Sequence, residues 1–511
     1  MDHMTGPGFS GGFQSVGGYH PTAPQRNALM IVFLAMALVV AAVPLGFVSG
    51  MADPQLPAPV VAGWTPTWAN GLAAALAIVL VVVPVLWVLA SGILDLFAFF
   101  LVQNALLIAG YFFLGVTAWR LESVAQDILR AGPLVLFINA VGFATLFLVM
   151  GLTYAFDTLR GIRMQPLHAP PEDYDFRLKW FLRGAGLVLA AILALPMART
   201  GIIPLLAEDA AAARAANMDS DVQRALYNLG AALMPFVTSG LVLLCTRKPL
   251  RTLGIDGCLA ASIVFVQVLS GNRFPLAIAA FVSLTLLTME RRFARPVLIV
   301  AFAACMFLFT GLSGFTGLLR QDRAQLREGN PIYNSLQAAF VGDNLIDVRD
   351  AAWVLSQWDF EPLLGRTYLG GLAAMLPSGI FPQKKEWHLG LTGVRIVGWD
   401  PEKHFGLRVT FFGEAFLNFG LAGVLALGWV LGMLFGTLLR AAHQAAGKRP
   451  SCLHYNLKLV VLMQMCMPLA NTSDAFTFWA MCGFLALQWI AVDLTLPAPT
   501  SPSLDHVPHR A

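Results

Sequence analysis

Charged residues are scarce in this chain, and apolar residues are abundant. Asp, Glu, Lys and Arg together make up 12% of the 511 residues, whereas hydrophobic residues make up 57%. Soluble globular domains carry roughly 25% charged residues, so this composition excludes an ordinary soluble domain. The alternating pattern of barrel strands is missing as well. Because lipid satisfies no backbone hydrogen bonds, the sequence predicts an all-α polytopic membrane protein.

Two chemical signatures are also missing. No G-x-x-x-x-G-K-[ST] sequence occurs, so ATP-driven work has no support in the sequence. No Cys and His residues cluster at metal-ligand spacing, and Asp219-Ser220-Asp221 is better explained as the start of a helix than as a metal motif. We therefore expect neither a metal nor a cofactor.

Apolar runs of about 20 residues predict about twelve transmembrane helices. The runs lie at 28–50, 71–91, 94–118, 133–156, 184–204, 227–245, 254–271, 274–289, 296–317, 411–439, 457–471 and 475–495. Lys and Arg gather in alternate short loops, for example at Arg160 and Arg163 and at Arg247 and Lys248. Such loops face the cytoplasm, which predicts that both termini lie inside.

These spans divide the chain into five segments. We expect a disordered cytoplasmic N-terminus at 1–27, nine spans within 28–317 and a large periplasmic loop domain at 318–410. Three further spans follow within 411–495. The tail at 496–511 is rich in Pro and Ser and is predicted to be disordered and cytoplasmic.

The long loop concentrates positive charge. Ten of the 33 Lys and Arg residues lie there, namely Arg320, Arg323, Arg327, Arg349, Arg366, Lys384, Lys385, Arg395, Lys403 and Arg408. Short outer loops normally avoid positive charge, although long loops are exempt from that rule. A basic segment held against the outer face of a membrane indicates an anionic ligand in that membrane, such as a lipid-linked pyrophosphate.

Three positions near the predicted outer surface are candidates for chemistry. Arg273, in a short turn between two spans, either snorkels at a helix end or reaches a phosphate. Asp343 lies with other aspartates on one face of an amphipathic helix predicted at 335–357; that face binds sugars, pairs with arginines or is solvated. Glu414, near the top of an apolar helix, is either a functional carboxylate or a partner in a salt bridge.

Two further patterns have structural as well as functional explanations. Residues 377–408 are predicted to form a loop, because prolines and glycines punctuate them. Their aromatic and polar side chains, including Trp387, either recognise sugars, form the core of a small domain or anchor the chain at the interface. Gly428, Gly432 and Gly436 predict close packing between two helices.

Three stretches in the second half of the chain resemble one family. They read LSGNRFPLAIAAF, then NLIDVRDAAWVLSQWDFEPLLGRTYLGGLAAMLPSGIFPQKK, then RVTFFGEAFLNFGLAGVLALGWVLG. In this order, over roughly 260–440, they resemble the Wzy-type oligosaccharide repeat-unit polymerases, which include O-antigen and exopolysaccharide polymerases. The family pattern falls on Arg273, Arg349, Asp350, Gly365, Tyr368, Pro377, Pro382, Lys384 or Lys385, Gly413, Glu414, Asn418, Phe419 and Gly420. The chain departs from it at Ser378, where the family often has Arg, and at Glu386, where it often has Pro.

The resemblance implies a GT-C-like integral membrane glycosyltransferase of the bacterial inner membrane. Such an enzyme moves a growing glycan from undecaprenyl pyrophosphate onto a new lipid-linked repeat unit at the periplasmic face. The implied partners are the undecaprenyl-pyrophosphate-linked oligosaccharide, membrane lipids, and a chain-length regulator and flippase of the same pathway, with no nucleic acid. An O-antigen ligase-type transferase and, from another class, a transporter or flippase for lipid-linked sugars are the alternatives.

Roles follow for the candidate residues. Glu414 is the first candidate for the general base and His404 the second, with His388 and Asp343 behind them. Arg273 and Arg408 are assigned to the pyrophosphate, whose developing charge guanidinium groups stabilise. The predicted substrate-binding residues are Arg320, Arg323, Arg327, Arg349, Asp343, Arg366, Tyr368, Lys384, Lys385 and Trp387.

Overall fold

The computed structural model describes most of the chain between residues 67 and 496. The described ranges are 67–91, 93–156, 170–207, 210–218, 221–247, 254–271, 274–290, 296–305, 347–376, 379–384, 386–401, 406–446, 452–472 and 475–496. Within these ranges the regular elements are all helices, which confirms the predicted all-α class. The predicted span at 28–50 and both predicted disordered ends lie outside the described residues.

Seven helical stretches in the described ranges are long and apolar enough to cross a membrane. They are α2 (Thr67–Ser91), α3 (Leu96–Ala109) with η1 (Gly110–Phe113), α5 (Ala125–Phe156), α6 (Pro171–Thr200), α8 (Asp221–Thr246), α17 (Gly413–Ala446) and α19 (Ala475–Gln488) with the π-helical η6 (Trp489–Asp493). Apolar but shorter are α9 (Gly254–Leu269), α10 (Phe274–Glu290) and residues 296–305, while α18 (Leu453–Ala470) has 18 residues. The chain is therefore a polytopic membrane protein, and its described ranges contain seven spans of full length, whereas the sequence predicts about twelve over the whole chain.

Local signals explain where individual helices begin and end. The carboxylate of Asp95 accepts a hydrogen bond from the backbone N–H of Ala98 (2.9 Å) and so caps the first turn of α3. Pro171 occupies the first position of α6, where its missing N–H costs nothing. Gly201 ends α6 in the left-handed conformation, with φ of 68°, which a residue without Cβ adopts readily.

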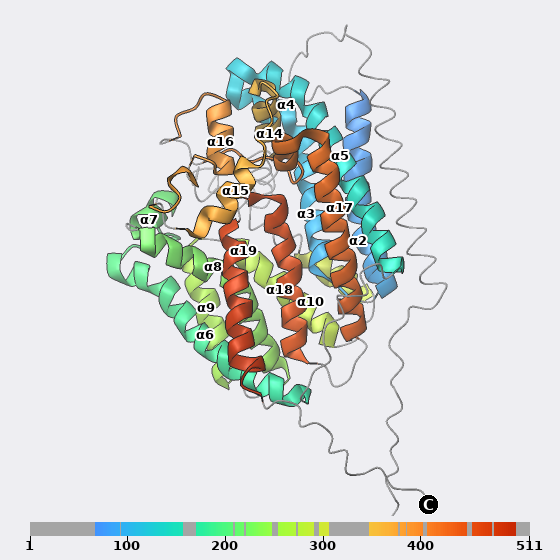
Figure 1. The fold of residues 1–511 in the computed structure, drawn as a ribbon. Helices are drawn as coiled ribbons and strands as arrows, with labels where there is room; N and C mark the ends of the chain where they lie inside the picture. Colours follow the sequence, from blue (N-terminus) through green and yellow to red (C-terminus); the bar gives the residue numbers. More distant parts are fainter. Residues whose placement is uncertain are drawn as a thin grey trace, which may run out of the picture.

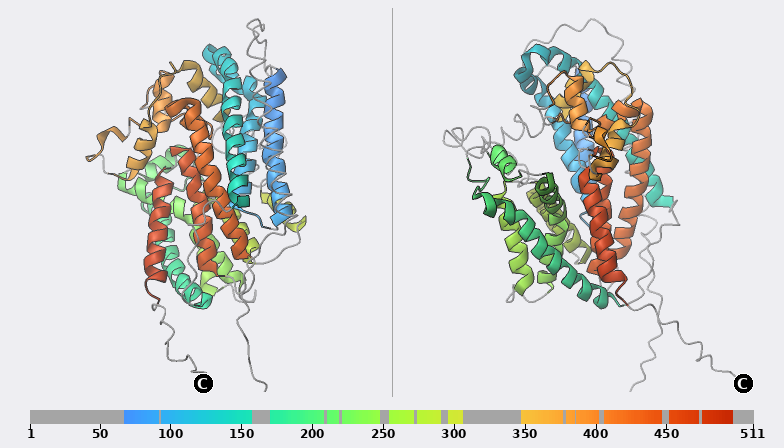
Figure 2. Two further views of the ribbon diagram at one scale, coloured as in Figure 1. Left: turned by 45° about the vertical axis from the view of Figure 1, so that its right-hand side comes forward. Right: turned by 60° about the vertical axis from the view of Figure 1, so that its left-hand side comes forward.

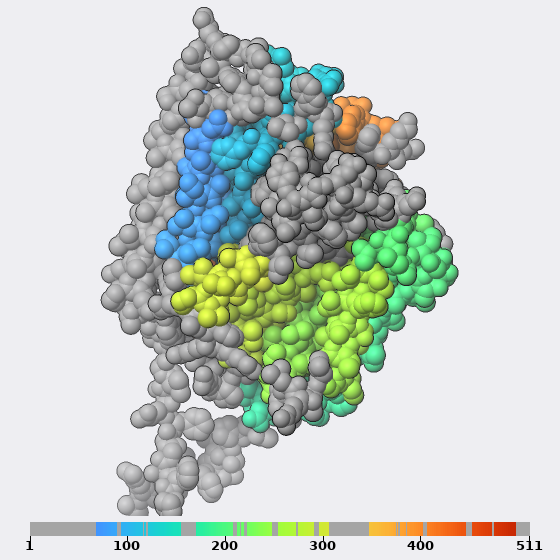
Figure 3. Space-filling model, turned by 180° about the vertical axis from the view of Figure 1, so that it is seen from behind, coloured from blue at the N-terminus to red at the C-terminus, as the bar shows by residue number. Residues whose placement is uncertain are grey.

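The helices form two groups that meet along a seam (Figure 1). One group contains α2, α3, α5 and α17, and the other contains α6, α8, α9, α10, α18 and α19. Figure 2 shows the same division from two further sides. On the rear face, in Figure 3, the segment around α10 borders α2 and α3. There the backbone N–H of Leu94 donates to the hydroxyl of Thr288 (3.2 Å) and so ties the two groups together.

Glycines bring α17 into direct backbone contact with α5. A Cβ at Gly428 would lie 2.8 Å from the carbonyl oxygen of Gly142, and a Cβ at Gly432 would lie 2.7 Å from that of Leu146. Gly436 approaches the next turn of α5 in the same way. The predicted close packing at these glycines is confirmed.

Short helices cover one end of the bundle. They are α14 (Asp347–Gln357), α15 (Arg366–Leu372) with η3 (Ala373–Met375), η4 (Pro382–Lys384) and α16 (Leu389–Ile396). Beside them lie α4 (Leu114–Ala118) and η2 (Trp119–Val124), while α7 (Ala210–Asn217) lies above α6 and α8. Only the second half of the amphipathic helix predicted at 335–357 falls in the described residues, where α14 occupies it.

The loop predicted at 377–408 is wrong in one part, because α16 is helical. Leu389, Gly390, Gly393 and Val394 are buried, so one side of this short helix packs inward. Gly390 lies against Gly406, with only 3.0 Å between the position of a Cβ and the partner Cα. Two of the glycines in this segment, Gly390 and Gly393, are therefore contact points of a packed helix.

Membrane helix α17 is interrupted near its first turns. Gly420 has φ of 61° and ψ of −153°, which breaks the helical hydrogen-bond ladder there. Two carbonyl groups beside the break accept from another segment instead, since Leu363 N–H donates to Leu417 O (3.0 Å) and Leu364 N–H to Asn418 O (3.1 Å). Irregular backbone at membrane depth requires such replacement partners.

Charged groups pair at the end of the bundle opposite α14–α16. The guanidinium of Arg247 contacts both Asp175 and Glu290 and so joins α8 to α6 and α10. Arg183 pairs with the buried Asp256 at 2.5 Å. These pairs lie on the side that the sequence predicts to be cytoplasmic.

Candidate functional site

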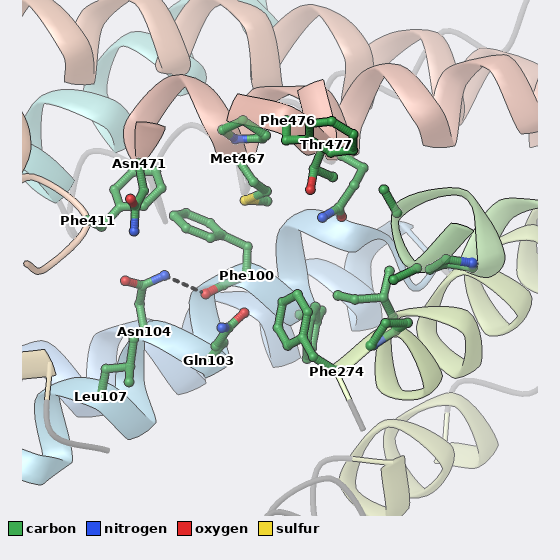
Figure 4. Close-up of a pocket in the computed structure, with 18 of the residues that line it drawn as sticks. Phe100, Gln103, Asn104, Leu107, Phe274, Phe411, Met467, Asn471, Phe476 and Thr477 are labelled. Carbon is green, nitrogen blue, oxygen red and sulfur yellow. Dashed lines mark hydrogen bonds between the residues drawn. The ribbon is translucent and has the colours of Figure 1, made fainter. Parts of the chain in front are cut away.

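A cavity of about 420 Å³ lies on the seam between the two helix groups. Its walls come from α3, α8, α10, α18 and α19, and Asp347, Val409 and Phe411 contribute from the end covered by the short helices. Cavities of this size between helices are a usual place for a small ligand. Figure 4 shows α3 on one side of the space and the α18–α19 region on the other.

Carboxamide side chains are unusually frequent in the lining. Five of them occur there: Gln103, Asn104, Asn228, Gln464 and Asn471. The amide of Asn104 donates to the carbonyl oxygen of Phe100 in its own helix (2.9 Å) and faces the cavity (Figure 4). An amide offers two donors and an acceptor, so a ring of amides can bind the donor and acceptor faces of hydroxyl groups.

Aromatic rings complete the lining. Six phenylalanines contribute, namely Phe99, Phe100, Phe236, Phe274, Phe411 and Phe476. Phe100 packs against Phe411 with ring centroids 4.4 Å apart, which connects α3 to the segment before α17. The cavity therefore combines flat apolar faces with hydrogen-bonding groups.

A carboxylate and a guanidinium group lie close together at the edge of this cavity. Asp347, the first residue of α14, lines the cavity, and its Oδ1 lies 3.6 Å from Nη1 of Arg408. The Arg408 side chain is 60% exposed whereas that of Asp347 is 15% exposed. The arginine is thus accessible to an anion beside a carboxylate that faces the cavity.

Asp350 fixes the position of Arg408 through the backbone. Its Oδ2 accepts from the Arg408 N–H (3.3 Å), while its Oδ1 binds the guanidinium of Arg349 (2.9 Å). Burial raises the pKa of Asp350, and the charge of Arg349 opposes that rise. Arg349, predicted to bind substrate, is placed by the structure in this nearly buried pair.

Glu414 lies behind the cavity wall. It is fully buried, and its Oε1 accepts from the Thr367 hydroxyl (2.6 Å) while its Oε2 accepts from the Thr472 N–H (2.7 Å). The Thr472 hydroxyl also donates to Oε1, and Asn418 donates to the Thr367 hydroxyl (2.7 Å). Asn471, the neighbour of Thr472, lines the cavity, but the carboxylate of Glu414 does not.

The remaining described candidates lie outside the cavity lining. Tyr368 stacks on Phe419 with centroids 6.2 Å apart, and burial raises its pKa. Trp387 packs edge-on against Phe381, at 5.3 Å between centroids. Lys384 donates to the carbonyl oxygen of Leu376, and Arg366 is exposed at the start of α15.

Seven candidates lie outside the described residues: Arg273, Arg320, Arg323, Arg327, Asp343, Lys385 and His404. Arg273 directly precedes Phe274, which lines the cavity. Its predicted role at a phosphate stays a prediction.

The carboxamides are the residues that the sequence predictions missed. Gln103 and Asn104 interrupt the apolar run LFAFFLVQNALLIA, and Gln464 interrupts LHYNLKLVVLMQMCMPLA. A polar side chain inside a membrane helix is costly unless it has a partner or a function, so these positions carried a usable signal.

In the described residues the chain is an all-helical polytopic membrane protein, and it encloses a cavity lined by carboxamides and aromatic rings. Comparison with protein-family models, with curated proteins and with solved structures finds no match. In the part of the chain that the structure describes, no group of three His, Cys, Asp or Glu side chains is placed to hold a metal ion.

Proposed function

We propose that this chain is a membrane glycosyltransferase that polymerises lipid-linked oligosaccharide repeat units. The donor would be a growing glycan on undecaprenyl pyrophosphate, and the acceptor would be a new lipid-linked unit. The reaction would take place at the periplasmic face of a bacterial inner membrane. Besides the cavity, the proposal rests on the family resemblance of residues 260–440.

The lining of the cavity is the single observation that supports this proposal most. Sugars present hydroxyl groups along their edges and C–H groups on their faces. Amides such as Asn104 and Asn471 suit the hydroxyls, and rings such as Phe100 and Phe411 suit the faces. The volume of about 420 Å³ suits a short stretch of glycan, with the lipid left in the membrane.

Asp347 and Arg408 supply the charges that glycosyl transfer requires. The bond between the anomeric carbon and the pyrophosphate oxygen breaks, and a bond from the acceptor oxygen to that carbon forms. We assign the acceptor proton to Asp347, because its carboxylate faces the cavity. Arg408, exposed beside it, would stabilise the charge on the leaving pyrophosphate, with Arg273 as a second predicted contact.

Glu414 has a different part in this proposal. Both of its carboxylate oxygens accept hydrogen bonds from Thr367 or Thr472, so it is poorly placed to accept a substrate proton. Its hydrogen bonds instead hold the turn that carries Asn471 into the cavity. The general base of the proposed reaction is therefore Asp347 and not Glu414, which the sequence predicts.

A transporter for lipid-linked sugars is the second candidate. The observation that favours it is the location of the cavity between two helix groups, with Pro235 and Pro468 in its walls. Transporters place their binding sites between structural halves and near interrupted helices. A ligase-type transferase would use the same cavity and donor.

Reconstitution with one substrate separates these candidates. The purified chain in lipid vesicles receives lipid-linked repeat units extracted from the native host after deletion of its gene. Growth of long glycan without another acceptor supports a polymerase, whereas movement of intact units across the bilayer supports a transporter. Asp347→Asn should lower chain growth by about 100-fold or more, the usual contribution of a general base. Asn104→Ala should lower it about tenfold, roughly the contribution of one hydrogen bond to the glycan. Exposed Gln357→Ala is the matched control, and unchanged growth in both cavity variants would overturn the proposed site.

A further inference from the structure

Helix α15 has its large apolar side chains on the outside. Leu369 and Leu372 are 50% and 57% exposed, and the flanking Leu364, Leu376 and Ile380 are exposed as well. Thr367, Gly370 and Gly371 form the buried side. In water this arrangement would be unfavourable, because it places small or polar groups inward and leucines outward.

The buried side of α15 is closely fitted, so the helix is not free to turn its leucines inward. A Cβ at Gly370 would lie 2.7 Å from the carbonyl oxygen of Trp387, and one at Gly371 would lie 2.8 Å from the Cβ of Thr472. Behind them, the Thr367 hydroxyl binds the buried carboxylate of Glu414. The orientation is therefore fixed by backbone contacts and by a buried hydrogen bond.

Two membrane helices measure how deep α15 lies. Arg440 is the first charged residue of α17 after the break at Gly420, and the roughly 20 residues between them correspond to about 30 Å of helix. The segment leading into α15 is bonded at that break. Because the hydrocarbon core is about 30 Å thick, α15 lies near its boundary.

Helix α19 independently places α15 near the same boundary of the hydrocarbon core. Asp493, paired with Lys458, marks its lower end, and Ala475 begins it about 27 Å away along the helix. Ala475 contacts Gly371 of α15. At this level the indole of Trp479 donates to the carbonyl oxygen of Leu372 (3.1 Å), and tryptophan is typical of membrane interfaces.

The apolar surface of α15 is continuous with a surface that already faces lipid. Phe419, Leu421 and Leu425 on α17 are exposed below it, as are other side chains along the membrane helices. Gly365, at the start of α15, packs directly against the ring of Phe419. The leucines therefore extend the lipid-facing side of α17 past the end of the span.

We propose that residues 360–376 form an interfacial element whose leucines bind the acyl chains of the leaflet at this end of the bundle. The segment predicted as a periplasmic loop domain would then be partly immersed in lipid. Arg366, exposed at the first turn of α15, lies where a lipid phosphate is within reach of a guanidinium. This inference concerns the membrane itself and does not depend on the proposed transferase function.

Photo-crosslinking to lipid tests the inference on the unaltered chain. The protein is reconstituted in phosphatidylcholine vesicles that contain a phosphatidylcholine with a diazirine on its acyl chain. After irradiation, trypsin cleaves at Arg366 and Lys384 and releases peptide 367–384, which carries the leucine face. We expect lipid adducts on this peptide and none on peptide 386–395, which carries α16. Adducts absent from 367–384 but present on membrane helices would overturn the inference.

Cysteine labelling gives a second readout of the same surface. Leu369→Cys and Leu372→Cys are compared with Gln357→Cys, an exposed position at the end of α14. An apolar environment raises the pKa of a thiol, and each unit removes about tenfold of the reactive thiolate. A membrane-impermeant maleimide should therefore modify the leucine positions at least tenfold more slowly, read peptide by peptide so that the six native cysteines do not interfere.

Equal labelling rates would mean that the segment stands in water and would refute the inference. Slow labelling combined with no lipid adducts would mean that a protein covers α15, which would also refute it. If the cysteine variants fail to fold, the crosslinking result on the unaltered chain decides.

Discussion

Replacing Glu414 by glutamine tests whether this carboxylate holds the fold or performs chemistry. Glutamine keeps the shape but turns one oxygen into an NH₂ group. If the amide oxygen stays with the hydroxyls of Thr367 and Thr472, the NH₂ group faces the Thr472 N–H, which now lies 2.7 Å from Oε2. Two donors then oppose each other in a buried place.

The expected loss of stability follows from that clash. A buried donor without an acceptor costs about 1–3 kcal/mol, and bonds to a charged group lie at the upper part of that range. We expect Glu414→Gln to lower the free energy of unfolding by about 2 kcal/mol. The exposed Glu361→Gln is the matched control and should stay within about 0.5 kcal/mol of the unaltered chain.

Unfolding of the purified protein in detergent measures the effect, by heat or by denaturant. A double variant with Thr367→Val should be less destabilised than the sum of the single changes, because in the glutamine background Thr367→Val loses a hydrogen bond to a neutral amide and not to a charged carboxylate. Full stability of Glu414→Gln together with lost polymer synthesis would refute this reasoning. Glu414 would then be the catalytic base that the sequence predicts.

Three further predictions concern other parts of the fold. Gly432→Ala should destabilise the protein by about 1–3 kcal/mol, since its Cβ would meet the Leu146 carbonyl oxygen at 2.7 Å, whereas Gly483→Ala meets nothing within 4 Å and should be neutral or stabilising in the same unfolding assay. Burial lowers the pKa of His388, so below about pH 6.5 the unfolded chain binds more protons than the folded one. The free energy of unfolding should therefore decrease as the pH is lowered below that value. The unfolding midpoint of His388→Gln should depend less on pH in that range. Arg183→Ala leaves the buried Asp256 without the guanidinium of Arg183 and should lower the free energy of unfolding by about 3–5 kcal/mol. Adding Asp256→Ala should restore part of that loss, and unchanged stability of Arg183→Ala would contradict the reasoning.

Seven of the predicted membrane spans are confirmed as full-length helices in the described residues, because their signal is local. An apolar run such as 71–91 needs no partner to be recognised, and α2 occupies it. The glycines of α17 were also readable, since their spacing places them on one helix face. In both cases the pattern within one element determines the outcome.

The cavity could not be predicted from the sequence, because it depends on which helices become neighbours. Asn104 and Asn471 are far apart in the chain, and they line the same cavity only after α3 packs near α18. The burial of Glu414 could not be predicted for the same reason, because it depends on contacts with Thr367 and Thr472, which are distant in the chain. The residues around Glu414 in the sequence do not reveal whether its carboxylate contacts a ligand or two threonines.

The break in α17 has a consequence for biosynthesis. The two carbonyl groups near Gly420 take their donors from Leu363 and Leu364, which the ribosome has already produced when the break emerges. The final hydrogen bonding of this late helix therefore depends on a segment translated before it. A deletion that removes those leucines would leave both carbonyl groups without these donors.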